Sequence, residues 1–277
     1  MQKNSSNIAI LGGNDKLTNS FYKDCLKNYK SVVYINFSDK PLSSSKSLKY
    51  NLKIFELAKC FNILIDNKVK KVVLLGKLSR PNLSNFKLDG VIDKYISDLS
   101  NAYKQGDGKI LELVISIFQK NGFNCVSPSR ASSNFDFHYL KENLIFNEKS
   151  SDKPDLKKSV SILNSISQYD NAQSIVVLNG YILAIEAVEG TDSMLNRVYK
   201  IKKKLNLLSK KEGILVKLPK RGQSLKIDLP VIGPKTVDLV KKANLNSIAI
   251  CQKNTIIDDV NLTLLMIKKN KINLFFI

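Results

Sequence analysis

The residues best suited to chemistry lie in two short polar segments of the C-terminal half. The first is a Glu-Gly-Thr-Asp run at residues 189–192, which combines two carboxylates, a hydroxyl and a glycine. Carboxylates act as general acids, general bases and ligands of hard cations, and a glycine lets the backbone approach a ligand. Thr191 or Asp192 could equally serve as a helix N-cap, which needs only one side-chain oxygen. The run alone leaves capping and catalysis both open.

The elements around this run are readable from the pattern of apolar residues. The apolar stretch 174–178 meets Asn179-Gly180, a strong hairpin signal, and the chain returns as a second apolar stretch over 181–188. Apolar residues then resume at helical spacing from Met194. We therefore expect residues 189–192 between a strand and a helix. The lysine-rich segment 200–204 is expected to form a solvated face of that helix or to steer the substrate towards the site.

The second polar segment surrounds Asp228, which interrupts the strand-like apolar run 225–232. A carboxylate in such a run is costly unless it is solvated, paired or bound to a metal. Gly233-Pro234 then opens a helix, since proline suits the first helical position. The unpaired N–H groups at that helix start, beside Lys235 and Thr236, could bind phosphate. The alternative is an ordinary proline-started helix with a solvated lysine.

The N-terminal half reads as alternating strands and helices. Apolar runs at 7–11, 31–37 and 71–75 predict strands, and helical periodicity over 52–66 predicts one of the helices between them. This βαβ rhythm indicates a Rossmann-like parallel sheet. The Gly12-Gly13 pair lacks the full glycine fingerprint of dinucleotide-binding folds. It is interpreted as a tight loop that approaches a sugar or a phosphate.

The middle of the chain marks a boundary between two α/β domains. Asp107 is expected to cap a helix that follows it, and 122–126 reads as the last strand of the N-terminal domain. The composition then turns to Ser, Asn, Lys and Asp. We assign residues 1–127 to a Rossmann-like domain, 128–155 to a linker and 156–277 to an α/β catalytic domain. His138, the only histidine in the sequence, excludes histidine triads and multi-histidine metal sites.

These segments resemble a known family. VEGTDSMLNR and DLPVIGPKTV are similar to the two signature stretches of the LpxI family of UDP-2,3-diacylglucosamine pyrophosphatases. Weaker similarity follows in the same order along the chain, in IAILGGNDKL, LLGKLSRP and QGDGKILELVISIFQKNGF. The resemblance implies a hydrolase that cleaves UDP-2,3-diacylglucosamine to lipid X (2,3-diacylglucosamine 1-phosphate) and UMP in lipid A biosynthesis.

The expected site follows from the residue chemistry and this resemblance. Asp228, Asp192 and Glu189 are the candidate catalytic residues and the candidate ligands of Mg²⁺, or of Mn²⁺, because a diphosphate is commonly cleaved with a hard cation. Residues expected to contact the substrate are Gly12, Gly13, Arg80, Asp107, Gly190, Thr191, Lys235 and Thr236.

Composition constrains partners and location. The 277-residue chain has 44 Lys and Arg against 24 Asp and Glu, a net charge of +20. This excess either favours anionic headgroups and diphosphates or reflects compositional bias. No nucleic-acid-binding module is recognisable, so nucleic acid is the less favoured partner. Four scattered cysteines and the lack of a signal or membrane-spanning run indicate a protein of the cytoplasm that at most adheres to a membrane face. The resemblance implies that this face is the cytoplasmic face of the inner membrane of a Gram-negative bacterium.

Two questions stay open on the sequence alone. A non-catalytic nucleotide-sugar or lipid-binding protein of the same fold is the alternative to an enzyme. The oligomeric state is unreadable, and a homodimer is compatible with the sequence.

Overall fold

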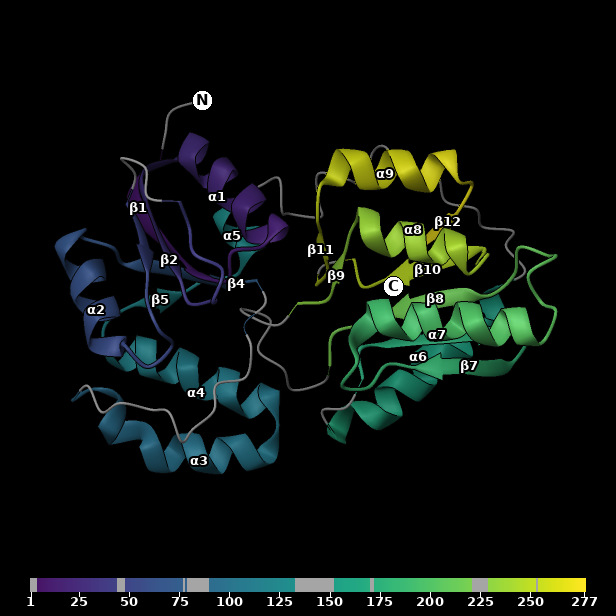
Figure 1. Ribbon diagram of the computed structural model, residues 1–277, viewed down its shortest axis with the longest axis horizontal. Coiled ribbons are helices and arrows are strands. Elements are labelled where there is room, and N and C mark those ends of the chain that lie inside the picture. Colours follow the sequence, from purple (N-terminus) through teal and green to yellow (C-terminus); the bar gives the residue numbers. More distant parts are fainter. Residues whose placement is uncertain are drawn as a thin grey trace. The chain divides into compact units, whose positions relative to one another are not determined.

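The computed structural model describes residues 4–43, 48–76, 78, 90–132, 152–169, 172–220, 229–252 and 254–277. The described residues up to 132 form one unit and those from 152 onward form a second (Figure 1). Each unit contains its own five-stranded sheet. The predicted α/β class with two domains is confirmed. The exact domain limits chosen from the sequence stay a prediction.

The first unit contains the predicted parallel sheet, in the order β3-β2-β1-β4-β5. Every neighbouring pair in it is parallel, because a helix or a longer connection returns the chain before each new strand. Ile8, Ala9 and Ile10 at its centre are fully buried, as expected for a sheet covered on both faces. Its strands are β1 (Asn4–Gly12), β2 (Tyr29–Asn36), β3 (Lys49–Asn51), β4 (Lys71–Leu75) and β5 (Asn124–Cys125).

Helices cover this sheet, and Phe61, Phe118 and Phe123 join two of them to it through aromatic packing. The second helix begins at Leu57 and not at residue 52 as expected, because Glu56 accepts a hydrogen bond from the Lys53 N–H and closes a turn there. The helices are α1 (Lys16–Asn28), α2 (Leu57–Asp66), η2 (Ile92–Tyr95), α3 (Ile96–Gln105), α4 (Asp107–Lys120) and α5 (Pro128–Ala131).

Helix α5 lies inside the range that the sequence assigned to a linker. It is attached to the first unit, because the Tyr29 hydroxyl donates a hydrogen bond of 2.9 Å to the Ala131 carbonyl. The Ser132 hydroxyl also bonds to the Asp24 carboxylate of α1. The linker residues 133–151 lie outside the described residues.

The second unit contains a mixed sheet in the order β12-β10-β8-β6-β7. Strand β6 runs antiparallel to both of its neighbours, whereas β8, β10 and β12 are parallel to one another. The predicted hairpin is confirmed: Asn179 and Gly180 have φ values of 47° and 79°, as a type I′ turn requires. The strands are β6 (Ser174–Leu178), β7 (Tyr181–Ile185), β8 (Ile214–Lys217), β10 (Ser247–Ile250) and β12 (Asn273–Phe276).

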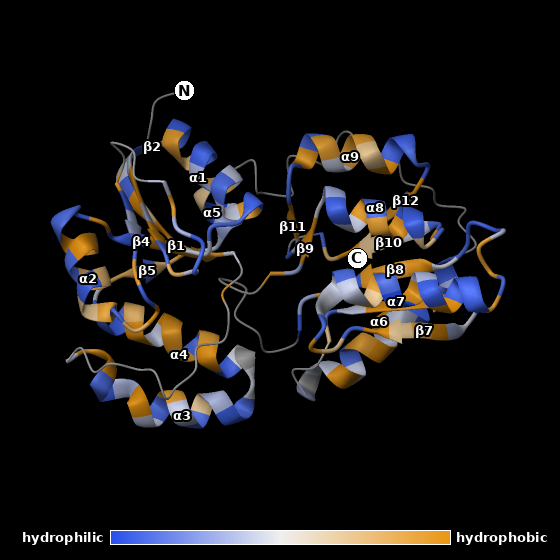
Figure 2. Ribbon diagram, in the orientation of Figure 1, coloured by the Kyte–Doolittle hydropathy of each residue, from blue (hydrophilic) through white to orange (hydrophobic). Residues whose placement is uncertain are grey.

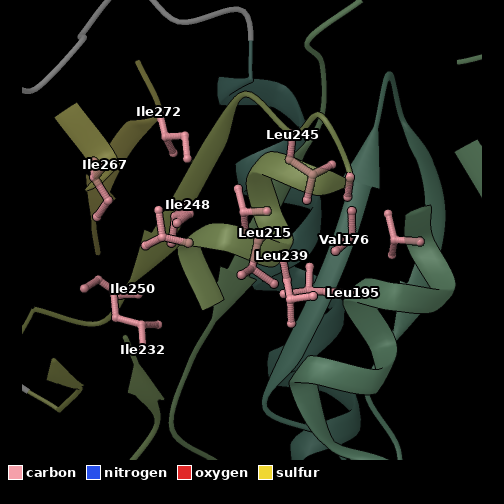
Figure 3. Close-up of a cluster of buried hydrophobic side chains, with 14 of the residues drawn as sticks. Val176, Leu195, Leu215, Ile232, Leu239, Leu245, Ile248, Ile250, Ile267 and Ile272 are labelled. Atoms are coloured by element: carbon pink, nitrogen blue, oxygen red, sulfur yellow. The ribbon is translucent and has the colours of Figure 1, made fainter. Parts of the chain in front are cut away.

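Helices pack on both faces of this sheet. Leu195 and Val240, from two helices on one face, join the core that Figure 3 shows, whereas Leu163 packs on the opposite face. A separate parallel pair is formed by β9 (Val231–Ile232) and β11 (Ile256–Ile257). The helices are α6 (Lys153–Ile166), η5 (Ser167–Tyr169), α7 (Gly190–Lys204), α8 (Pro234–Lys242) and α9 (Val260–Lys269).

The expected solvated face at 200–204 is wrong at one position, Lys202, which is 0% exposed. Its ammonium donates hydrogen bonds of 2.9 Å to the Glu212 carbonyl and 2.8 Å to the Asn244 carbonyl. Burial lowers the pKa of Lys202 below its usual value. A single lysine therefore connects the loops that follow α7 and α8.

Hydropathy agrees with this layering. In Figure 2 the strands are largely orange, while α7 shows blue in its last turn, where three lysines lie. Among the described residues, no helix combines the length and apolar character needed to cross a bilayer.

Candidate functional site

The Glu-Gly-Thr-Asp run comes after β7 as predicted, but the strand ends at Ile185 and not at residue 188. Of this run only Glu189 precedes α7, and residues 190–192 form the first turn of that helix. Gly190 is the first residue of α7 and has φ of +77°, and a Cβ added there would meet no other atom within 4 Å. The glycine is therefore required by backbone conformation and not by crowding. Its N–H bonds to the Ala187 carbonyl at 3.2 Å, which closes the turn before the helix.

Glu189 stabilises this turn through both of its carboxylate oxygens. Oε1 lies 2.6 Å from the Arg197 guanidinium, and Oε2 accepts a hydrogen bond of 3.1 Å from the Ala187 N–H. Arg197 also donates to the Ile185 carbonyl at 2.9 Å. The Arg197 hydrogen bond holds the pKa of the Glu189 carboxyl below its usual value. The geometry thus gives Glu189 a structural role, and its catalytic and metal-binding roles stay predictions.

Thr191 does not act as the N-cap that the sequence left open, because the N-cap position of α7 is Glu189. Its buried hydroxyl instead lies among three polar side chains. It donates to Glu186 Oε1 at 3.0 Å, accepts from Lys217 Nζ at 2.7 Å and lies 3.2 Å from Ser174 Oγ. A hydroxyl has one donor and two acceptor positions, so these partners saturate Thr191. No capacity is left on this hydroxyl for a phosphate, and its substrate contact stays a prediction.

Asp192 joins the start of α7 to the start of α8. Its Oδ2 lies 2.7 Å from Lys235 Nζ, and the two side chains are 31% and 78% exposed. Asp192 raises the pKa of Lys235 through this hydrogen bond. Because both side chains are at least partly exposed, the pair contributes at most about 1 kcal/mol to stability. Its consequence for function is that one carboxylate and one ammonium lie side by side, and a ligand can reach both from solvent.

The start of α8 follows the prediction. Pro234 is its first residue, and Gly233 occupies the N-cap position. A Cβ on Gly233 would approach the Cβ of Asp258 to 3.0 Å, so close packing against the end of β11 favours glycine there. Thr236 is buried in the first turn, only 7% exposed.

Neither α7 nor α8 has a side-chain cap on its first turn. Backbone N–H groups at an uncapped helix start, together with the helix dipole, favour an anion. The Asp192–Lys235 pair brings these two helix starts together. Their N–H groups could therefore donate hydrogen bonds to the two phosphates of a diphosphate. This is the chemistry that the sequence proposed for Lys235.

The glycine pair of the first unit is held by internal contacts. A Cβ on Gly12 would lie 1.7 Å from the Leu75 carbonyl oxygen, so glycine allows β1 to approach β4. The Gly13 carbonyl accepts a hydrogen bond of 2.7 Å from the Tyr34 hydroxyl, and Asp15 caps α1 through the Thr18 N–H. The proposed approach of this loop to a substrate stays a prediction.

Three other candidates have a different outcome. The expected N-cap position of Asp107 is wrong, because α4 begins at Asp107 itself and Gly106, with φ of +108°, takes the N-cap position. Contact of Asp107 with the substrate stays a prediction. Arg80 and Asp228 lie outside the described residues. The candidate site residues that the described structure brings into contact with one another lie in the second unit, around the first turns of α7 and α8.

The sequence missed two residues that the structure brings to Thr191. Lys217 ends β8 and is 7% exposed, and Ser174 begins β6 and is 0% exposed. They face each other directly across the β6–β8 pair. A signal did exist in the sequence, because the charged Lys217 directly follows the apolar run 214–216. Glu186 follows β7, and its N–H bonds to the Ser174 carbonyl at 2.9 Å.

Comparison with known proteins covers both halves of the chain. The family model for the LpxI N-terminal domain matches residues 7–135, and that for the LpxI C-terminal domain matches residues 143–275. A curated relative, the UDP-2,3-diacylglucosamine pyrophosphatase LpxI of Caulobacter vibrioides, is 30% identical over 196 residues, which is 70% of each chain. The segments that form the Glu-Gly-Thr-Asp turn and the start of α8 both fall within the C-terminal match. The chain belongs to the LpxI family.

Proposed function

We propose that this chain hydrolyses the diphosphate of UDP-2,3-diacylglucosamine, releasing 2,3-diacylglucosamine 1-phosphate (lipid X) and UMP. The observation that carries this proposal is membership of the LpxI family over both halves, together with a relative named for that pyrophosphatase activity. The two uncapped helix starts joined by Asp192 and Lys235 are the part of the described structure suited to a diphosphate.

The reaction needs attack by water at one phosphorus and departure of the other phosphate. In our proposal the water oxygen bonds to the phosphorus nearer the glucosamine, and the bond from that phosphorus to the bridging oxygen breaks. The electron pair leaves with UMP, and the water gives its proton to a carboxylate. Lys235 and the N–H groups of the helix starts would stabilise charge on the departing phosphate. Asp228 is our first choice for activating the water.

A divalent cation is part of the proposal. Among the described residues no three His, Cys, Asp or Glu side chains are grouped as a metal cage would require. This donor set fits an ion shared with substrate phosphates, since Mg²⁺ is commonly held by one or two carboxylates and substrate oxygens. Asp228 and Asp192 would hold it, and Glu189 would join through the lone pairs that its bonds to Arg197 and the Ala187 N–H leave available. When bound, Mg²⁺ or Mn²⁺ would neutralise phosphate charge and orient water.

Incubation of the purified protein with UDP-2,3-diacylglucosamine and Mg²⁺, followed by mass analysis, tests the function. We expect lipid X and UMP in equal amounts. Asp192→Asn should lower the rate, whereas Asp238→Asn on the exposed side of α8 should not. Tight substrate binding without products from folded protein would favour a non-catalytic nucleotide-sugar or lipid-binding role instead.

The direction of attack has its own test. Turnover in ¹⁸O-water should place the heavy oxygen in lipid X and leave UMP unlabelled. Label in UMP would mean attack at the other phosphorus, and our placement of the carboxylates against the substrate would be wrong.

We also propose transient contact with the inner-membrane surface, where a diacylated substrate would reside. The net charge of +20 supports attraction to anionic lipids. Cosedimentation with anionic vesicles at low salt, compared with uncharged vesicles, measures this contact. Equal binding to both would remove the electrostatic argument.

A further inference from the structure

The polar cluster at Thr191 contains one unsatisfied atom. Glu186 Oε1 accepts the Thr191 hydroxyl, but Oε2 of the same carboxylate is buried and has no hydrogen-bond partner among the described residues. Leaving a buried acceptor unpaired costs about 1–3 kcal/mol, and more when it is charged. Such an atom beside a proposed substrate site indicates a place for a donor from outside the chain.

The orientation of this carboxylate is fixed from two strands. Lys217, at the end of β8, donates to Thr191, and Thr191 passes a hydrogen bond on to Glu186. Ser174 at the start of β6 bonds to the same hydroxyl and accepts the Glu186 N–H through its carbonyl. Because Thr191 and Lys217 are both buried, they can hold Glu186 in one place.

The charge nearby selects the kind of donor. The Lys217 ammonium lies only two hydrogen bonds away from Oε2 along the chain Lys217–Thr191–Glu186. This ammonium already supplies a positive charge to the carboxylate, so a further cation gains less there than it would at an isolated carboxylate, whereas a neutral O–H or N–H group is unaffected. Both sources of such a group exist in the reaction proposed above: the attacking water, and the hydroxyl or amide groups of the acylated glucosamine.

We propose that Glu186 Oε2 accepts a hydrogen bond from a neutral O–H or N–H donor in the enzyme–substrate complex, and that Thr191 and Lys217 position it. Glu186 is then a further catalytic residue, while Thr191 and Lys217 act through it. This inference rests on the proposed function, because the donor belongs to that reaction.

Glu186→Gln tests the inference with little change in shape. The amide oxygen would accept the Thr191 hydroxyl, so the NH₂ group would take the place of Oε2 and present a donor where an acceptor is needed. We expect kcat/KM to fall about 10- to 100-fold, the range for losing a hydrogen bond to a charged group. A fall in kcat with unchanged KM identifies water as the donor. A rise in KM identifies the glucosamine.

The control is Glu112→Gln. In the described part of the chain, the Glu112 carboxylate contacts only Lys109, on the same helix α4. It should retain wild-type kinetics. If Glu186→Gln keeps kcat/KM within twofold of wild type, the role of Glu186 is overturned while the proposed function stands. If the wild-type protein itself shows no turnover, the proposed function and the role of Glu186 both fail.

Thr191 supplies a second comparison that does not depend on the folding of the Glu186 variant. Thr191→Val keeps the shape and removes the hydroxyl, whereas Thr191→Ser keeps the hydroxyl. We expect Thr191→Val to lose activity as Glu186→Gln does and Thr191→Ser to retain most of it, with both variants folded by far-ultraviolet circular dichroism at the assay temperature. Equal activity in both variants would overturn the positioning role.

Discussion

Replacing Lys202 with methionine should destabilise the second unit far more than the same change at its neighbour. Methionine keeps the length and apolar character of the buried stem but removes the ammonium that bonds to the Glu212 and Asn244 carbonyls. The partly buried Glu212 carbonyl loses this donor, at about 1–3 kcal/mol, whereas the Asn244 carbonyl keeps the Glu212 N–H at 3.2 Å. Part of this loss is offset, because the variant no longer buries a charge. We expect a net loss of about 1–2 kcal/mol in the free energy of unfolding.

The assay is urea unfolding followed by far-ultraviolet circular dichroism, with amide hydrogen exchange of β8 and β10 assigning the change to the second unit. Lys203→Met is the matched control, since Lys203 is exposed in the same helix turn, and it should stay within about 0.5 kcal/mol of wild type. Equal stability of the two variants would refute the reasoning.

The pH dependence of this comparison follows from the lowered pKa of Lys202. Its usual value is 10.5, and burial lowers it in the folded chain. Between the folded pKa and 10.5 the unfolded chain therefore binds more protons than the folded one, so wild-type stability rises with pH across this window. Relative to Lys202→Met, the wild-type advantage should grow as the pH rises through this window and should be constant below the folded pKa.

Three further predictions concern the site and the first sheet. Asp228→Ala should abolish turnover while leaving folding and substrate binding largely intact; near-normal turnover in a folded variant would contradict its assignment. Chelation of metal-stripped protein should stop activity, and Mg²⁺ or Mn²⁺ should restore it with little change in melting temperature, whereas full activity in excess chelator would exclude a required cation. Gly12→Ala should prevent folding, because its Cβ would lie 1.7 Å from the Leu75 carbonyl. Gly180→Ala, at φ of +79° in open space, should cost only about 1 kcal/mol, and equal melting temperatures for the two would contradict this.

The parts of the fold that were predicted correctly depend on local signals. The Asn179-Gly180 turn carries its own conformational preference, and the buried strands of the first unit are continuous apolar runs. The start of α2 was misplaced, because the apolar periodicity continues through a turn that Glu56 closes with a single hydrogen bond. The sequence cannot show in advance whether such a bond will outcompete one more helical turn.

The sequence predicted where the Glu-Gly-Thr-Asp run lies along the chain, but not the hydrogen-bond partners of its side chains. The Glu-Gly-Thr-Asp run was recognised because its residue types are unusual between a strand and a helix. The partners of Thr191 were not, because Ser174 and Lys217 lie 17 and 26 residues away and meet it only through the pairing of β6 with β8. Likewise, the commitment of Glu189 to Arg197 depends on how the chain folds back after β7.

The ion pair between Asp192 and Lys235 has a thermodynamic consequence for ligand binding. A phosphate that pairs with the Lys235 ammonium frees the Asp192 carboxylate from this ion pair. A cation that binds the carboxylate likewise frees the ammonium. Anion and cation should therefore bind with positive cooperativity, and the coupling must be equal in both directions. Calorimetry with UDP and Mg²⁺ would measure it as a lower Kd for each in the presence of the other. In Lys235→Ala that mutual enhancement should shrink, since the carboxylate would then be available from the start.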